Sequence, residues 1–239
     1  EQLEKDYKIK VSYVSILFDG TIDYDSLKDL LESTEKTLVS LMHINNEIGT
    51  ILELKKVADL CKSKDALFHS DSVQSVGHYH LDLQTTPIDF LAASAHKFHG
   101  PKGIGFVYIR KNSGLKPLIH GGTQERGVRA GTESIHDIVG LDTSLAIAYE
   151  NLEAEMIHIK ALKLYFIEQL KKTIVGVKFN GCCSDSEKST YTLVNVCLPV
   201  SEVNAPMFLF QLDLKGIACS KGSACQSGSD KGSHVLTQI

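Results

Sequence analysis

Polar side chains that could do chemistry stand directly after three apolar segments of the chain. They supply an amide, a carboxylate, a hydroxyl, an imidazole and an amine, from Asn46, Asp71, Ser94, His96 and Lys97. Asp71 is 25 residues from Asn46 and 26 from Lys97, about the length of one strand and one helix. Successive units of this kind bring the ends of their strands to one edge of a sheet. We therefore expect these side chains to converge, with Gln74 near enough to join them.

An aspartate and a lysine at one site point to a particular cofactor. Pyridoxal phosphate is held by a lysine as a Schiff base, and a carboxylate keeps its ring nitrogen protonated so that the ring can accept electrons. The lysine must act as a nucleophile near neutral pH, which burial and a nearby cation favour by lowering its pKa. Ser94 and His96 would then donate to the phosphate. A separation like that of Asp71 and Lys97 also arises by chance, so on spacing alone the alternative of unrelated side chains stays open.

The elements that must position these side chains are strands alternating with helices. The β-branched and apolar segments predict strands at 37–44, 66–69, 88–93 and 104–109. A helix is expected at 54–61, where apolar residues recur at helical spacing. Strands separated by helices imply an α/β fold with a mostly parallel sheet and flanking helices.

The second half of the chain predicts a smaller, incomplete α+β lobe. A glycine-rich loop at 120–132 precedes a run of helix-forming residues at 134–172, which predicts one long helix or a kinked pair. Further elements are expected as a strand at 193–198, a helix near 205–212 and a strand at 216–220. We expect a large cofactor-binding domain at 1–140, and a connecting helix with a small domain at 141–239 that carries the Cys225 loop.

The composition is that of an ordinary globular chain and excludes several classes of protein. The 239 residues carry 25 Lys and Arg against 29 Asp and Glu, and 43% of them are hydrophobic. Such a chain can bury a core, and without a basic cluster we expect no nucleic-acid partner. Its apolar runs are far shorter than the roughly 20 residues that span a bilayer, so no membrane is expected. Six cysteines without a C-x-x-C pair indicate reduced thiols and a cytoplasmic location.

Five motifs resemble, in order and spacing, those of the cysteine desulfurases. They lie at 43–49, 69–75, 94–103, 121–132 and 222–225. Cysteine desulfurases are class V aminotransferases, a group of pyridoxal-phosphate enzymes with the type I fold. The resemblance extends over nearly the whole chain and implies the same fold, cofactor and activity here.

The resemblance implies a role for each side chain at the expected cofactor site. Lys97 would carry the cofactor as a Schiff base and move protons at the α-carbon of the substrate. Asp71 would pair with the pyridine nitrogen, and Gln74 would bond the ring oxygen. Ser94 and His96 would bind the phosphate.

Three further residues complete the site that the resemblance implies. Asn46 would lie at the cofactor and the substrate carboxylate, and Thr132 would reach the phosphate of the neighbouring subunit of a homodimer. Cys225 would attack the sulfur of L-cysteine, leaving L-alanine and a persulfide. The sulfur would pass to an acceptor or iron–sulfur scaffold protein, for cluster assembly and tRNA thiolation. No intrinsic metal is implied, and a transient iron–sulfur ligand role for Cys225 stays open.

Other cysteines and histidines favour structural interpretations. Cys219 is expected at the buried end of a strand, with a disulfide or a sulfur relay as the alternatives. The Cys182 and Cys183 pair lacks further ligands at zinc-site spacing, which disfavours a metal site. His78 and His80 alternate around a tyrosine, as on the solvated edge of a strand.

The chain departs from the resembled family at both ends. Family members carry a phosphate loop and a histidine that stacks on the cofactor before the part matching Glu1, and an arginine that grips the substrate carboxylate after the part matching Ile239. We therefore expect a chain truncated at both ends. Two alternatives to a desulfurase follow: an inactive fragment that keeps the fold as a structural or interaction module, and a related carbon–sulfur or selenocysteine lyase.

Overall fold

The computed structural model describes residues 2–7, 9–201, 205–221 and 232–239. These residues form two compact units, each with its own contacts. Unit 1 is drawn from 1–33, 45–52 and 159–239, and unit 2 consists of 34–44 and 53–158. This grouping differs from the expected domains at 1–140 and 141–239, and that division stays a prediction.

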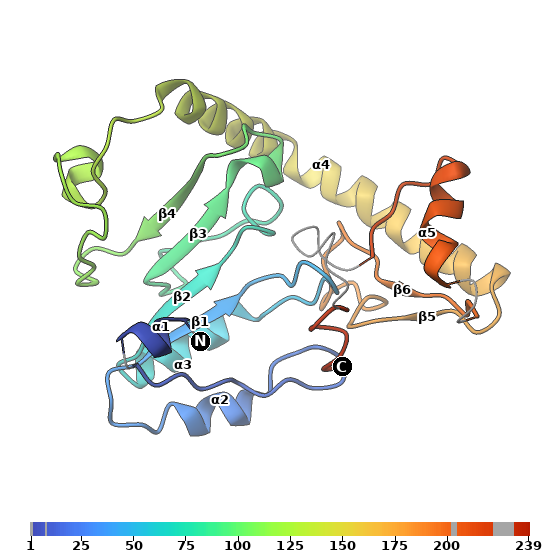
Figure 1. Cartoon of the computed structure of the whole chain (residues 1–239), viewed down its shortest axis with the longest axis horizontal. Helices are drawn as coiled ribbons and strands as arrows, with labels where there is room; N and C mark the ends of the chain where they lie inside the picture. Colours follow the sequence, from blue (N-terminus) through green and yellow to red (C-terminus); the bar gives the residue numbers. More distant parts are fainter. Residues whose placement is uncertain (1, 8, 202–204, 222–231) are drawn as a thin grey trace. The chain divides into compact units, whose positions relative to one another are not determined.

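Unit 2 is built on a sheet of four strands in the order β1-β2-β3-β4 (Figure 1). The strands are β1 (Leu38–Met42), β2 (Leu67–Asp71), β3 (Phe90–Ser94) and β4 (Gly105–Ile109). β1, β2 and β3 run parallel to one another, and β4 runs antiparallel to β3. The expected α/β fold with a mostly parallel sheet is therefore confirmed.

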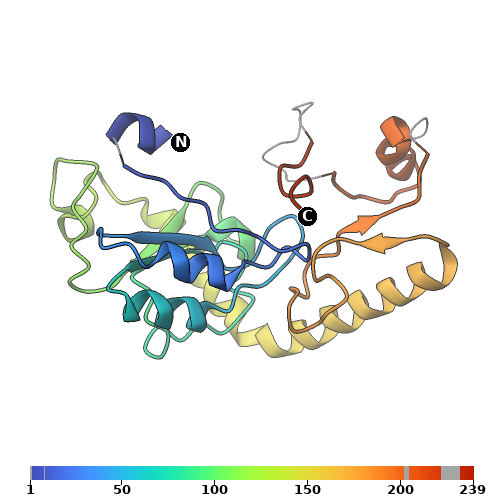
Figure 2. The ribbon, with the colours of Figure 1, turned by 90° about the horizontal axis from the view of Figure 1, so that it is seen from below.

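Helix α3 (Leu54–Ser63) connects β1 to β2 and covers one face of this sheet (Figure 2). Its apolar side chains follow helical spacing, so they all reach the core, and Leu54, Val57, Ala58 and Cys61 are buried. In β2 the side chains alternate in burial, and Phe68 is fully enclosed. This α3 crossover is what brings the ends of β1 and β2 to the same edge.

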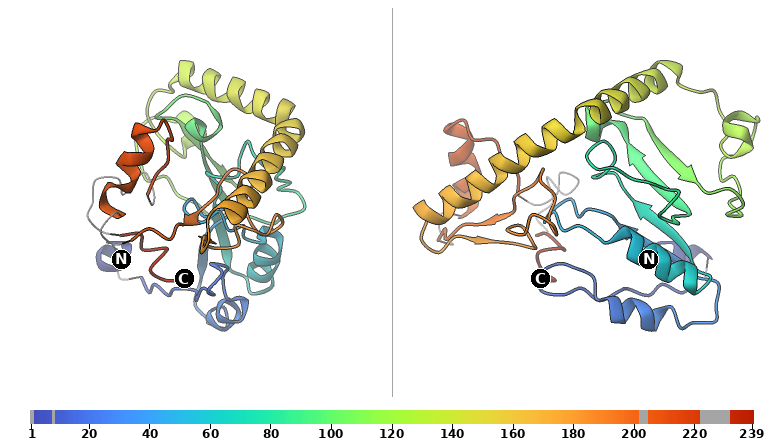
Figure 3. Two further views of the ribbon diagram at one scale, coloured as in Figure 1. Left: turned by 90° about the vertical axis from the view of Figure 1, so that its right-hand side faces the viewer. Right: turned by 180° about the vertical axis from the view of Figure 1, so that it is seen from behind.

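Helix α4 (Ile135–Thr173) is one continuous element of 39 residues, which settles the expected choice between one long helix and a kinked pair. Its residues up to 158 belong to unit 2 and those from 159 belong to unit 1. In unit 1 the chain continues from α4 into the antiparallel pair of β5 (Lys178–Phe179) and β6 (Val196–Cys197), as Figure 3 shows. The ammonium of Lys171, at the end of α4, lies 5.6 Å from the ring centre of Phe179.

The remaining elements of unit 1 are α1 (Gln2–Tyr7), α2 (Tyr24–Leu30) and α5 (Ala205–Leu214). Unit 2 also holds two short 3₁₀ turns, η1 (Ala95–Phe98) and η2 (Gln124–Gly127). Within the described residues, no helix is both long and apolar enough to cross a bilayer.

The prediction of a strand at 216–220 is wrong. Residues 217–220 follow a turn and have no regular structure, because a strand needs a ladder partner and none of the described residues pairs with them. The strand expected at 193–198 is reduced to the two residues of β6, and its partner β5 was not expected.

Candidate active site

The carboxyl edge of the unit 2 sheet carries two of the expected side chains. In the strand register Asp71 stands beside Met42 of β1 and Ala92 of β3, and Ser94 ends β3 two residues later. One oxygen of the half-buried Asp71 carboxylate accepts a hydrogen bond from the backbone of Val73, at 3.1 Å. This bond turns the chain immediately after β2, so the Asp71 side chain stays at the sheet edge.

The turn η1 continues directly from β3 and presents the serine, histidine and lysine. Ala95 and Phe98 are fully buried and fix the turn to the core, which leaves His96 exposed and Lys97 half-buried. The hydroxyl of Ser94 lies 2.8 Å from Nδ1 of His96, so the two side chains form a pair. One proton lies in this hydrogen bond, so a neutral pair offers an anion one donor, and both groups can donate to it when the ring carries both of its protons.

The turn after Asp71 is joined to η1 by His78. Its Nε2 lies 2.9 Å from the carbonyl oxygen of Lys97. Since a carbonyl only accepts, His78 must carry its proton on Nε2 and donate it. Sequence reasoning assigned His78 to a solvated strand edge and missed this role. The alternation around Tyr79 suggested a strand, whereas residues 73–78 form turns.

Gly77 lets the same turn approach η1 closely, and its replacement tests this packing. Gly77 has φ +81°, and a Cβ there would lie 2.6 Å from Cβ of Phe98. Gly103, with φ +87°, has open space around its Cβ position. Both alanine variants force a left-handed backbone, which costs about 1 kcal/mol, and Gly77→Ala adds overpacking of about 2 kcal/mol. We expect urea unfolding to show this extra loss for Gly77→Ala only, and equal losses in the two variants would contradict it.

The structure thus brings Asp71, Gln74, Ser94, His96 and Lys97 to one edge of unit 2. Gln74 lies half-buried in the turn that His78 and Gly77 hold against η1. The ammonium of Lys97 makes no hydrogen bond or ion pair with any residue that the structure describes. No described residue therefore occupies this amine.

Asn46 lies in a turn of unit 1. The side chain of Asn45 accepts hydrogen bonds from the backbone of Glu47, at 2.9 Å, and of Ile48, at 3.0 Å. This turn fixes the backbone on both sides of Asn46, whose own side chain is half-buried. Because Asp71 and Lys97 belong to unit 2, the expected convergence of Asn46 with them stays a prediction.

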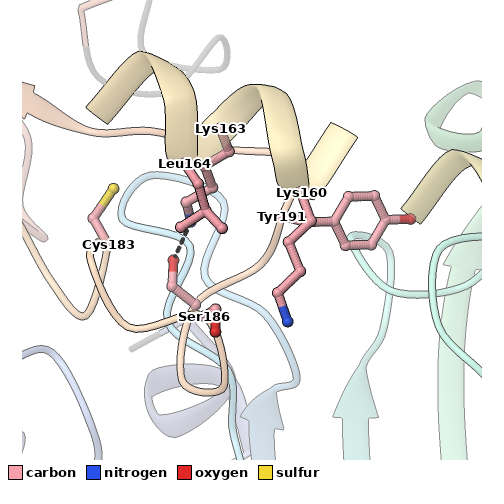
Figure 4. Close-up of a pocket in the computed structure, with 7 residues that line it drawn as sticks. Lys160, Lys163, Leu164, Cys183, Ser186 and Tyr191 are labelled. Atoms are coloured by element: carbon pink, nitrogen blue, oxygen red, sulfur yellow. Dashed lines mark hydrogen bonds between the residues drawn. The ribbon is translucent and has the colours of Figure 1, made fainter. Parts of the chain in front are cut away.

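Lys163 supports the Asn46 turn from α4. Its buried ammonium donates to the carbonyl oxygen of Thr190, at 2.7 Å, and to the hydroxyl of Ser189, at 2.9 Å. Figure 4 shows Lys163 pointing from α4 into the loop that carries Tyr191. Burial lowers the pKa of this amine. Thr190 in turn donates its backbone N–H to the carbonyl of Gly49, at 2.8 Å, so the turn is tied to the helix.

Two of the expected site residues are not among the side chains that the structure places at this sheet edge. Thr132 is exposed in the segment just before α4, and its role toward a neighbouring subunit stays a prediction. Cys225 lies outside the described residues, so its role also stays a prediction.

The other cysteines divide into buried and exposed thiols. Burial is the main cause that raises the pKa of Cys61 and of Cys182 to about 11, with Asp89 and Asp19 adding to it. Few of these thiols are ionised near neutral pH, which makes them poor nucleophiles. Cys219, expected at the buried end of a strand, is exposed and follows a turn, so that expectation is wrong.

Sequence reasoning also missed the environment of His43. It is buried after β1, its Nδ1 is enclosed without a hydrogen-bond partner in the part of the chain that the structure describes, and its ring centre lies 6.3 Å from that of Tyr79. Both residues line a cavity of about 220 Å³ in unit 2, together with Asp82 and several leucines. Burial lowers the pKa of His43 to about 4.

The Aminotransferase class-V family model matches residues 1–236. The chain belongs to the class V aminotransferase family. The expected resemblance is therefore confirmed.

Relatives of this class V aminotransferase chain include proteins named for sulfur chemistry. It is 39% identical over 230 residues to "Cysteine desulfurase IscS" of Dictyoglomus turgidum, which covers 96% of this chain and 57% of the relative. A NifS-like protein from Rickettsia africae superposes with a TM-score of 0.84 at 29% identity, over 99% of this chain and 62% of the neighbour. A structure titled "SspA in complex with cysteine" superposes with a TM-score of 0.79 at 28% identity. The match covers 99% of this chain and 64% of that chain. The chain thus spans about three fifths of the length of these relatives, and its fold is the type I fold of NifS-like proteins.

Proposed function

We propose that the protein containing this chain is a pyridoxal-phosphate-dependent cysteine desulfurase. It would convert L-cysteine to L-alanine and keep the sulfur as a persulfide on Cys225. The observation that carries the proposal is the junction of β3 and η1, where Lys97 lies next to the Ser94 and His96 pair at the same sheet edge as Asp71. The names of the relatives support the choice of reaction.

The functional groups of the side chains at this edge match those of pyridoxal phosphate. The cofactor offers a phosphate, a ring nitrogen, a ring oxygen and an aldehyde carbon. The Ser94 and His96 pair suits the phosphate, Asp71 suits the nitrogen, and Gln74 suits the oxygen. Lys97 has an ammonium without a partner in the described part of the chain and would hold the aldehyde carbon. When bound, the cofactor supplies an electron sink for bonds at the substrate α-carbon.

The other roles belong to the chain itself. Lys97 would move a proton at the α-carbon of L-cysteine. A primary amine on a short, anchored turn can take this proton as a general base and give it back as a general acid at the same atom. Asn46 would orient the substrate carboxylate through its amide. Cys225 would accept the sulfur as a persulfide, which needs the thiolate form of that side chain. A neighbour solved with cysteine supports L-cysteine as the substrate.

The partners that we propose follow from the same reaction. A second copy of the chain would receive Thr132 at its phosphate site, as in a homodimer. A persulfide is a carried group, so a sulfur-acceptor or iron–sulfur scaffold protein would remove it, for cluster assembly or tRNA thiolation.

The test is made on the complete source protein, with the 239-residue chain beside it. The complete protein, supplied with pyridoxal phosphate and L-cysteine, is expected to absorb in the visible range and to release alanine and sulfide in equal amounts with a thiol reductant present. Absence of both would overturn the proposal. A visible band from the complete protein, with none from the 239 residues, would instead show that these residues alone are an inactive part.

The variant Cys225→Ala separates a desulfurase from a carbon–sulfur or selenocysteine lyase. Loss of the sulfur acceptor is expected to lower the release of alanine and sulfide from cysteine at least about 100-fold. The matched control is Cys219→Ser, which removes an exposed thiol of the same segment and should leave the rate unchanged. Alanine release that survives in Cys225→Ala would favour the lyase.

A further inference from the structure

Lys163 is a buried lysine of α4 that the proposed reaction leaves without a task. It is 7% exposed, and its ammonium donates to two acceptors of one segment, the carbonyl oxygen of Thr190 at 2.7 Å and the hydroxyl of Ser189 at 2.9 Å. The cavity beside it has a volume of about 10 Å³, which is room for about one water molecule, so bulk water does not solvate the charge (Figure 4). Burying an ammonium costs free energy that its hydrogen bonds must offset. Lys163 therefore holds residues 189–190 against α4.

The segment that Lys163 holds is paired directly with the turn that carries Asn46. The two form an antiparallel bridge at Thr50 and Ser189. The backbone N–H of Thr190 donates to the carbonyl of Gly49, at 2.8 Å. A Cβ at Gly49 would lie 3.1 Å from Cγ2 of Thr190, so the two segments are in close contact. Thr190 thus bonds α4 through its carbonyl and the turn through its N–H.

The turn itself is closed by its own backbone hydrogen bonds. The N–H of Asn45 donates to the carbonyl of Thr50, at 3.0 Å, and the N–H of Gly49 donates to the carbonyl of Asn45, at 2.9 Å. A turn closed in this way moves as one body, and its contacts with Thr190 set where it lies in unit 1. A shift of the segment that Lys163 holds would therefore displace the half-buried side chain of Asn46.

We propose that Lys163 is a positioning residue that places the amide of Asn46 for the substrate carboxylate, acting through Thr190. The inference rests on the proposed function, in which Asn46 orients that carboxylate. A hydrogen bond weakens steeply when its groups leave their preferred distance and angle, so a small displacement of the amide is enough to weaken binding. The consequence is specific: ligands that carry a carboxylate should bind less tightly when Lys163 is lost, and amines without one should not.

The test compares L-alanine with ethylamine, which lacks the carboxylate, as ligands of the complete, cofactor-loaded protein. Lys163→Met keeps the length and the apolar stem of the side chain and removes its charge. It is expected to raise the dissociation constant of L-alanine about 3-fold to 10-fold and that of ethylamine less than twofold. Lys163→Arg keeps hydrogen-bond donors and should bind L-alanine more tightly than Lys163→Met. Equal losses for the two ligands would show a general structural role and overturn the inference.

A double variant tests whether Lys163 acts through Asn46. Adding Lys163→Met to Asn46→Ala should weaken L-alanine binding no further than Asn46→Ala alone, because the group that Lys163 places is then absent. Independent, additive losses would contradict the inference. The matched control is Lys160→Met on the same helix. Lys160 lines the same small cavity, but its ammonium is partly exposed and pairs with the exposed Glu187, at 3.3 Å. This variant should leave both dissociation constants unchanged, and a loss equal to that of Lys163→Met would overturn the assignment.

A second measurement does not depend on the reaction. Hydrogen exchange of the peptide that contains residues 45–52 reports the bonds that close the Asn46 turn and tie it to Thr190. Its protected amides are expected to exchange at least about threefold faster in Lys163→Met and at the original rate in Lys160→Met. Unchanged exchange in Lys163→Met would overturn the inference. A protein that binds L-alanine but makes none from L-cysteine would count against the proposed function alone, since the comparison of L-alanine with ethylamine would still decide the role of Lys163.

Discussion

Replacement of Lys97 by alanine is expected to remove the visible absorbance of the cofactor-loaded protein and to lower alanine formation from cysteine at least about 1,000-fold. The magnitude is that of losing a positioned general acid or base together with the covalent anchor of the cofactor. No other residue of η1 (Ala95–Phe98) can substitute as an amine, because its other polar side chain is the imidazole of His96. The loss should appear in kcat, since the amine is needed in the chemical step.

The matched control for this variant is Lys102→Ala. Lys102 is exposed in the turn between η1 and β4, five residues from Lys97 in the same motif. Its removal should leave both spectrum and rate unchanged. After borohydride reduction and proteolysis, mass spectrometry is expected to find the cofactor on the peptide that contains Lys97. Cofactor found on Lys102 instead, or a visible band that persists in Lys97→Ala, would contradict the assignment.

The position of Lys97 follows from features that are local in the sequence. The apolar segment at 88–93 predicts a strand, and the structure has β3 at Phe90–Ser94. The expected strands at 37–44, 66–69 and 104–109 correspond in the same way to β1, β2 and β4. The periodicity of the apolar residues predicts the strands of this sheet and the amphipathic helix between them. For that reason the edge that carries Asp71 and Lys97 was predictable without any contact information.

The parts that were not predictable depend on distant segments. β5 and β6 are two residues each and exist through pairing between residues 17 and 19 positions apart, which no local pattern records. The grouping of residues 45–52 with the C-terminal part rests on contacts such as the bridge between Thr50 and Ser189. His78 was misassigned for the same reason, because its partner is a backbone carbonyl of η1.

His43 differs from these cases because its burial has a measurable thermodynamic consequence. Nδ1 of the imidazole has no hydrogen-bond partner among the described residues, and the ring faces Tyr79 and a partly apolar cavity. Burial therefore lowers its pKa to about 4 from the ordinary histidine value of 6.5. Between these two pH values the unfolded chain binds a proton at this position and the folded chain does not.

The free energy of unfolding should consequently fall as the pH is lowered from 6.5 to 4, and this group should contribute no further loss below 4. A shift of this size corresponds to about 3 kcal/mol, all of which is retained above pH 6.5. The variant His43→Phe keeps a ring beside Tyr79 and removes the proton site, so its stability should depend less on pH in that window by the same amount. Urea unfolding at several pH values measures the difference, and NMR titration of the His43 ring in the folded protein gives the pKa directly. A midpoint near 6.5, or identical pH profiles for both proteins, would show that the ring is reached by water and is not buried as the cavity geometry requires.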